Sequence, residues 1–114
     1  MAEDYAESDG GLGMAHRQLR IMQWNINSVR GRRVMLQSCL ASECIDVCLL
    51  QEILLRDTTN FRIAGYRLFS LPQEVGGRGL TTLVKSCIPV EQWTDKPNCG
   101  DGVEVLGIRL HLWQ

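Results

Sequence analysis

The stretch that decides the fold is LRIMQWNINSVRGRRVMLQSCLASECIDVCLLQE, residues 19–52. Its first part, LRIMQWNIN, alternates between an apolar face and a polar face, and the polar face ends in Asn25 and Asn27. Its last part, IDVCLLQE, is apolar on both faces and ends in Gln51 and Glu52, which is the pattern of a strand buried between two layers. Two strands with polar carboxyl ends are therefore predicted.

The segment between these strands has the period of an amphipathic helix. Apolar side chains recur close to every 3.6 residues from Val29 to Glu43, and Asn27 and Ser28 can cap the helix N-terminus. Gly31 weakens the first turn. The surrounding arginines are expected on the solvated side of this helix: Arg30, Arg32 and Arg33. A strand, a helix and a strand in this order predict a right-handed crossover and a parallel pair of strands.

Strands with short connections are predicted for the rest of the chain. Residues 66–71 and 80–85 form two candidate strands, separated by a glycine-rich turn at 76–79. Residues 103–113 alternate and predict a further strand, in which Arg109 lies opposite the apolar face. The apolar face of that strand is lined by four residues: Leu106, Ile108, Leu110 and Leu112. The expected fold class is α/β.

Composition indicates one small globular domain. The chain has 114 residues, of which 45% are hydrophobic. Four acidic residues fall within the first ten positions, whereas all Lys and Arg lie from Arg17 onward, so residues 1–17 are predicted to be a disordered acidic tail. The rest is mildly basic, which suits a polyanionic partner but excludes a strongly basic binding domain. With no secretion signal and no membrane-spanning run, an intracellular protein, nuclear or cytoplasmic, with no membrane partner is expected.

The cysteines predict free thiols. Their number is odd, no close Cys-x-x-Cys pair occurs, and no histidine lies beside them, which argues against structural zinc. Reduced side chains in packed positions are expected at all five: Cys39, Cys44, Cys48, Cys87 and Cys99.

The polar ends of the first two strands form the candidate site. Ligands gather at the carboxyl ends of parallel strands, where Asn25, Asn27, Gln51 and Glu52 are expected. A carboxylate beside amides suits a magnesium-assisted phosphoryl site, with Glu52 binding the metal and Asn25 positioning the phosphate or the attacking water. The alternative is that the asparagines form a turn or helix cap and that Glu52 is only the first solvated residue after a buried strand. The pattern alone leaves both open.

Five motifs indicate a resemblance to a known protein family: LRIMQWNINSVRGRR, IDVCLLQE, GYRLF, GGRGLTTLVKSCIPV and VEVLGIRLHL. In order and spacing they resemble the opening half of endonuclease/exonuclease/phosphatase domains. The likeness is strongest to the apurinic-type endonuclease domain at the N-terminus of non-LTR retrotransposon polyproteins, which also carry a reverse transcriptase. The resemblance covers residues 18–114 as a partial domain. It implies the N-terminal half of a two-sheet, deoxyribonuclease-like α/β sandwich, to be completed by a missing C-terminal half.

The resemblance also implies site residues and a reaction. The family's active-site Asn in W-N and Glu in L-Q-E match Asn25 and Glu52, which would hold Mg²⁺ or Mn²⁺. Asn27 lies where many nuclease members carry Asp or Asn, and Gly79 matches the glycine that begins the third conserved strand. The implied activity is endonucleolytic hydrolysis of DNA. Three isolated basic side chains could contact phosphate, although single charges of this kind usually only keep a protein surface hydrated: Arg62, Arg78 and Lys85.

Departures from the family are equally plain. Its catalytic Tyr, its Gly-Asp-x-Asn segment and its Ser-Asp-His motif are not found in this sequence. Gly100-Asp101 is predicted to be a hairpin turn, and His16 and His111 to be surface or packed residues. Trp24 is expected in the core, while Trp93 and Trp113 could stack on a base or pack.

A truncated phosphodiesterase domain that is inactive by itself is therefore expected. One alternative is a non-catalytic remnant or incomplete gene product with at most a binding role and an exposed apolar sheet face. Another is a phosphatase of the same superfamily that acts on lipid or inositol phosphates.

Overall fold

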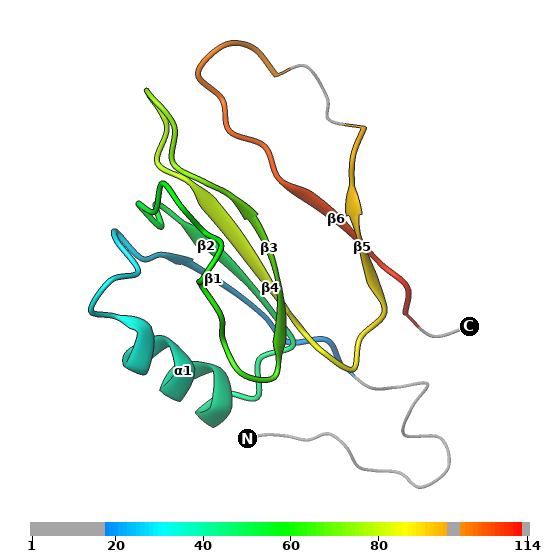
Figure 1. Ribbon diagram of the computed structural model, residues 1–114. Coiled ribbons are helices and arrows are strands. Elements are labelled where there is room, and N and C mark those ends of the chain that lie inside the picture. Colours follow the sequence, from blue (N-terminus) through cyan, green and yellow to red (C-terminus); the bar gives the residue numbers. More distant parts are fainter. Residues whose placement is uncertain (1–17, 96–98, 113–114) are drawn as a thin grey trace, which may run out of the picture.

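The computed structural model describes residues 18–95 and 99–112, which form a mixed α/β fold (Figure 1). The elements are β1 (Ile21–Asn25), α1 (Arg33–Ser42), β2 (Val47–Gln51), β3 (Tyr66–Leu71), β4 (Leu80–Lys85), β5 (Val90–Trp93) and β6 (Gly107–Leu110). A four-stranded sheet has the order β1-β2-β4-β3, and a separate two-stranded sheet pairs β5 with β6. The predicted tail, with His16, and Trp113 lie outside the described residues.

The predicted parallel pair of strands with a helix between them is confirmed. β1 and β2 are parallel, with Ile21 opposite Val47 and Asn25 opposite Gln51, and α1 connects them over one face of the sheet (Figure 1). β4 pairs antiparallel with both β2 and β3. The carboxyl ends of β1 and β2 and the amino end of β4 therefore lie at one edge of the sheet, which we call the Glu52 edge.

The predicted helix begins four residues later than expected, and the predicted cap is wrong. Arg32 occupies the N-cap position without a side-chain hydrogen bond. The amides of Ser28 and Val29 instead donate to the carbonyl oxygens of Glu52 and Ile53, at 2.8 and 3.1 Å. These bonds prolong the contact between β1 and β2 past Asn25, so the chain has to turn before the helix can start, and Gly31 takes a φ of 75° in that turn.

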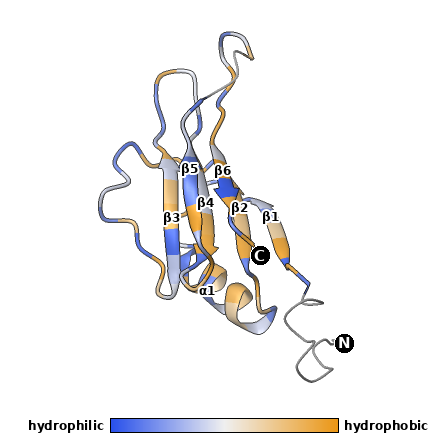
Figure 2. Cartoon of the chain, turned by 90° about the vertical axis from the view of Figure 1, so that its right-hand side faces the viewer, coloured by the Kyte–Doolittle hydropathy of each residue, from blue (hydrophilic) through white to orange (hydrophobic). Residues whose placement is uncertain are grey.

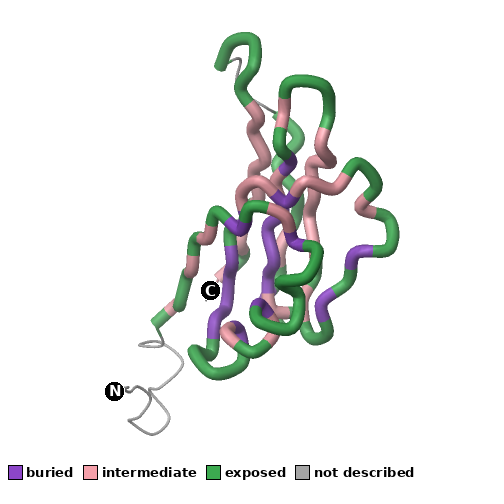
Figure 3. The backbone as a smooth tube through the Cα atoms, turned by 90° about the vertical axis from the view of Figure 1, so that its left-hand side faces the viewer, coloured by how far each residue is buried: buried purple, intermediate pink, exposed green. Residues whose placement is uncertain are grey.

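Apolar clusters lie on both faces of the four-stranded sheet. The larger one joins α1 to the sheet through residues such as Leu36, Leu40, Leu50 and Leu83. The smaller one lies on the other face, where three buried residues meet the partly buried side chains of the hairpin formed by β5 and β6: Val47, Val84 and Ile88. Figure 2 shows that β2 is hydrophobic over most of its length, and Figure 3 shows buried residues concentrated along the middle of the sheet. Among the strands, β2 and β4 carry the most buried residues.

The sheet face opposite α1 is only partly covered. The hairpin packs on it through the second cluster, yet Ile21 and Leu49 remain 57% and 37% exposed. The apolar face that a remnant was expected to expose is therefore covered in part by the hairpin of β5 and β6. Trp24 packs against the larger cluster, as predicted, and Trp93 on β5 is 40% exposed.

Two other expectations require correction. The strand predicted over 103–113 is shorter, because only residues 107–110 pair, and its partner β5 was not predicted. The thiols are free, but Cys48 alone is buried, whereas Cys44, Cys87 and Cys99 are exposed in connections between elements. Asp101 and Gly102 form a turn within the connection from β5 to β6. Among the described residues, no helix has the length and apolar character needed to cross a membrane.

Candidate functional site

The structure brings Asn25 and Glu52 together at the Glu52 edge. Asn25 is the last residue of β1, and Glu52 directly follows β2. The Asn25 amide nitrogen Nδ2 donates to the Glu52 carboxylate oxygen Oε2 at 3.0 Å. Parallel pairing causes this contact, because it aligns the carboxyl ends of the two strands. The amide and carboxylate predicted to form the site are therefore direct neighbours.

The backbone around this pair is held in an unusual conformation. Four residues other than glycine have positive φ values here: Asn27 (49°), Ser28 (80°), Glu52 (54°) and Leu54 (57°). Such conformations cost about 1 to 3 kcal/mol each and persist where the surroundings fix them, often at functional sites. The fixing bonds come from both neighbouring strands: Ser28 on the β1 side donates to the Glu52 carbonyl, and the Leu54 amide donates to the Arg78 carbonyl on the β4 side. Glu52 is thus presented by a strained and well-supported turn.

Asn27 lies apart from this pair. It is exposed, with a left-handed backbone, and its carbonyl oxygen accepts a hydrogen bond from Arg32 Nη1 at 3.2 Å. No contact that the structure gives for the described residues joins its side chain to Asn25 or Glu52. The role expected for Asn27 at the site stays a prediction.

A guanidinium adds positive charge to the site. Arg78 Nη1 lies 3.9 Å from Glu52 Oε1, so the two carboxylate oxygens face different partners, the Asn25 amide and the Arg78 guanidinium. Arg78 immediately precedes Gly79 and β4, the strand that pairs with β2. The other two isolated cations lie elsewhere: Lys85 pairs with the buried Asp46 at 3.8 Å, and Arg62 donates to the carbonyl of Phe61.

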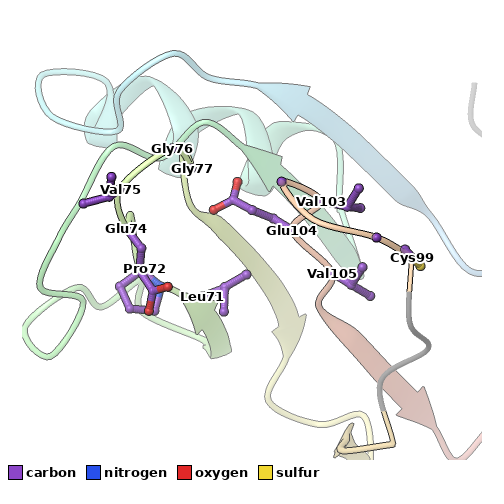
Figure 4. Close-up of a pocket in the computed structure, with 12 residues that line it drawn as sticks. Leu71, Pro72, Glu74, Val75, Gly76, Gly77, Cys99, Val103, Glu104 and Val105 are labelled. Atoms are coloured by element: carbon purple, nitrogen blue, oxygen red, sulfur yellow. The ribbon is translucent and has the colours of Figure 1, made fainter.

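Glu104 fixes the turn that carries Arg78. Its carboxylate accepts from the Arg78 amide at 3.0 Å and from the Gly79 amide at 3.0 and 3.1 Å. Figure 4 shows this carboxylate directed at the Gly76–Gly77 turn, at the wall of a cavity of about 350 Å³ between residues 71–77 and 99–105. Sequence reasoning missed Glu104, because it is distant in sequence from the turn and precedes β6 within an alternating stretch.

The residues at the edge fit a hard divalent cation that is completed by water and substrate. No group of three or more His, Cys, Asp or Glu that could hold a metal occurs within residues 18–95 and 99–112. Glu52 nevertheless offers a carboxylate, and the side-chain amide oxygen of Asn25 is a donor of the same hard type that could be a second ligand. Mg²⁺ commonly binds through one or two carboxylates and fills its other positions with water and substrate phosphate. His111 is not near this edge, because it follows β6 and its Nε2 lies 2.9 Å from Glu91 Oε2.

Comparison with protein-family models gives no match, and neither does comparison with curated proteins. Among solved structures, the chain is similar to the crystal structure of the Xenopus laevis APE2 catalytic domain, with 31% identity and a TM-score of 0.50. The similarity covers 63% of this chain and 26% of that chain. The predicted α/β class is confirmed: the partial sheet matches part of a deoxyribonuclease-like fold, and the chain resembles part of an AP endonuclease-like domain of the endonuclease/exonuclease/phosphatase superfamily.

Proposed function

We propose that this chain is part of a Mg²⁺- or Mn²⁺-dependent phosphodiesterase domain that acts on DNA. The observation that carries the proposal is the hydrogen bond of 3.0 Å between Asn25 and Glu52 at the carboxyl ends of two parallel strands. The similarity to the APE2 catalytic domain supports the superfamily. An origin in a non-LTR retrotransposon polyprotein, upstream of a reverse transcriptase, is the finer part of the proposal and is carried by the sequence motifs.

The chain's own residues would bind and orient the reacting groups. A bound divalent cation would stabilise negative charge on the phosphate. Glu52 would hold that ion, and the hydrogen bond from Asn25 keeps the carboxylate in one orientation. The neutral Asn25 amide can approach a phosphate oxygen without adding negative charge. The family's Tyr, Gly-Asp-x-Asn and Ser-Asp-His groups do not occur in this sequence, so the chain by itself is expected not to cleave DNA.

Metal binding by the full chain tests the proposal. In an electron paramagnetic resonance titration with Mn²⁺, Glu52→Gln is expected to weaken binding by about 10-fold or more, because it removes the charged ligand. Glu43→Gln is the matched control, since Glu43 is an exposed carboxylate that contacts Arg20. Equal Mn²⁺ affinity in the wild type and Glu52→Gln would contradict the proposed site.

Substrate class is tested separately. Duplex DNA is expected to bind the chain in the presence of Mn²⁺, and a soluble inositol phosphate is expected not to displace it at equal phosphate concentration. Displacement by the inositol phosphate would favour the phosphatase alternative. A non-catalytic remnant with at most a binding role would not bind Mn²⁺ through Glu52, and any binding of DNA would not depend on Mn²⁺. Nicking of supercoiled plasmid that Glu52→Ala abolishes would show that the chain is active alone, contrary to expectation.

A further inference from the structure

The contact between Arg78 and Glu52 is weak by its geometry. The two charged groups are 3.9 Å apart, and their side chains are 64% and 32% exposed. An exposed pair of this kind contributes little to stability, because water screens both charges. The guanidinium is therefore free to exchange Glu52 for another anionic partner at low cost.

The backbone that carries Arg78 is, in contrast, fixed from two sides. On one side, Glu104 accepts hydrogen bonds from the amides of Arg78 and Gly79. On the other side, the carbonyls of Arg78 and Gly79 accept from the amides of Leu54 and Ile53, at 3.0 and 3.3 Å. Bonds from amides to a carboxylate are charge-assisted and stronger than neutral ones. Arg78 is consequently a loosely paired cation on a firmly held turn, directly beside the candidate metal ligand.

Arginine in this position suits a phosphate. Its planar guanidinium offers paired donors that match two phosphate oxygens. A divalent cation on Glu52 would neutralise the carboxylate and repel the guanidinium, which leaves Arg78 to contact an anion next to the metal. A phosphodiester held by that metal would supply such an anion. Arg20 and Arg109, in contrast, are paired with carboxylates away from this edge, Glu43 and Glu91.

We propose that Arg78 contacts a backbone phosphate of the DNA substrate, and that its guanidinium occupies the Glu52 carboxylate until a divalent cation replaces it. This inference rests on the proposed function, because it takes Glu52 as the metal ligand. Arg78 then has two roles, pairing with Glu52 in the absence of metal and contacting phosphate in its presence. Loss of the Arg78 charge should strengthen metal binding and weaken DNA binding at the same time, a combination that general damage to the fold would not produce.

The test compares Arg78→Gln with Arg67→Gln in the full chain. Arg67 is also an exposed arginine, but it lies on β3 opposite Val84, toward the other edge of the sheet. Without DNA, Arg78→Gln is expected to bind Mn²⁺ up to about fivefold more tightly, which is the upper limit for an exposed ion pair. With Mn²⁺ present, fluorescence anisotropy of labelled duplex DNA should show a salt dependence smaller by about one phosphate contact. Arg67→Gln should change neither value.

Arg78→Lys distinguishes charge from shape. It is expected to keep the salt dependence of the wild type but to bind DNA more weakly, because an ammonium cannot contact two oxygens in the same way. An unchanged salt dependence in Arg78→Gln, or unchanged or weaker Mn²⁺ binding, would overturn the role of Arg78 while Glu52→Gln still reports on the metal site. If Glu52→Gln bound Mn²⁺ as tightly as the wild type, the proposed function itself would be overturned instead.

Discussion

Burial of the Cys48 thiol makes the free energy of unfolding depend on pH in the alkaline range. Cys48 is the second residue of β2 and is fully buried. Burial first, and then the nearby Cys39, raise the pKa of its thiol from 9.0 to about 12. The folded state therefore keeps the thiol neutral at a pH where the unfolded chain releases the proton. The associated stability is fully present below about pH 9 and is lost as the pH rises toward 12.

Replacement of this thiol should remove that part of the pH dependence. We expect the free energy of unfolding of the wild type to fall between pH 9 and 12, by at most about 1.4 kcal/mol per pH unit for one proton. Cys48→Ala should show a shallower fall in urea titrations under reducing conditions, despite a lower stability at neutral pH. Equal slopes would show that Cys48 does not control the alkaline transition.

Tyr66→Phe provides the control for this measurement. The pKa of Tyr66 is raised too, by burial first and then by Asp46, and its hydroxyl donates to the Ile45 carbonyl at 2.6 Å. Its ionisation contributes in the same direction, with stability lost above its usual pKa of 10.0. The Cys48 contribution is therefore the change in slope that persists in the Tyr66→Phe background.

Sequence alone predicts half of the candidate site. Asn25 and Glu52 follow from the rule that polar residues at the carboxyl ends of adjacent parallel strands meet, and the structure places them in contact. Arg78 and Glu104 do not follow, because their contacts depend on how two turns fold toward each other. Periodicity assigns a residue to a face of a strand, but it carries no information on which distant segment reaches a turn.

At the scale of elements, the turn before β4 depends on Gly79. Its φ is 85°, and a Cβ there would lie 2.8 Å from the Ile53 side chain and 3.1 Å from the Gln73 amide. Gly76 has a similar φ of 83° with open space around it. The two glycines therefore form a matched pair in which the same backbone conformation occurs with and without close neighbours.

Alanine substitutions at these two glycines separate the cost of a positive φ from the cost of a clash between Cβ and neighbouring atoms. We expect Gly76→Ala to cost about 1 to 2 kcal/mol, which is the cost of a left-handed residue with a side chain. Gly79→Ala should cost a further 1 to 3 kcal/mol, about the cost of overpacking, and should also weaken Mn²⁺ binding because Ile53 adjoins Glu52. Urea titration and Mn²⁺ binding measure the two effects. Equal stability of the two variants would mean that the contacts around Gly79 relax freely.

Strand bounds are predictable where turn residues mark both ends of the strand. The observed bounds of β3 and β4 equal the predicted ones, since turn residues flank both strands. The start of α1 was wrong because hydrogen bonds to the turn after β2 compete with the first helical turn. β5 was missed because its four residues, largely exposed, are too few for an alternation to be recognised.

At the scale of the molecule, the two faces of the sheet are unequally supported. The cluster between α1 and the sheet holds most of the buried apolar residues, whereas three buried residues connect the sheet to the hairpin of β5 and β6. Regions with few buried apolar contacts open at lower free energy than the core. The hairpin should therefore open without unfolding of the rest.

Hydrogen exchange on two truncation variants tests this order of opening. Leu83 on β4 is fully buried in the larger cluster, so Leu83→Ala should lower the global free energy of unfolding by about 2 to 5 kcal/mol and speed exchange in β1, β2 and β4 together. Ile108 on β6 is only partly buried in the smaller cluster, so Ile108→Ala should speed exchange chiefly in β5 and β6 and leave the slowest amides of β2 and β4 near their wild-type rates. Mass spectrometry of peptides from the two regions measures both rates. Uniform acceleration by Ile108→Ala would show instead that hairpin and sheet unfold as one cooperative unit, and that the smaller cluster couples them fully.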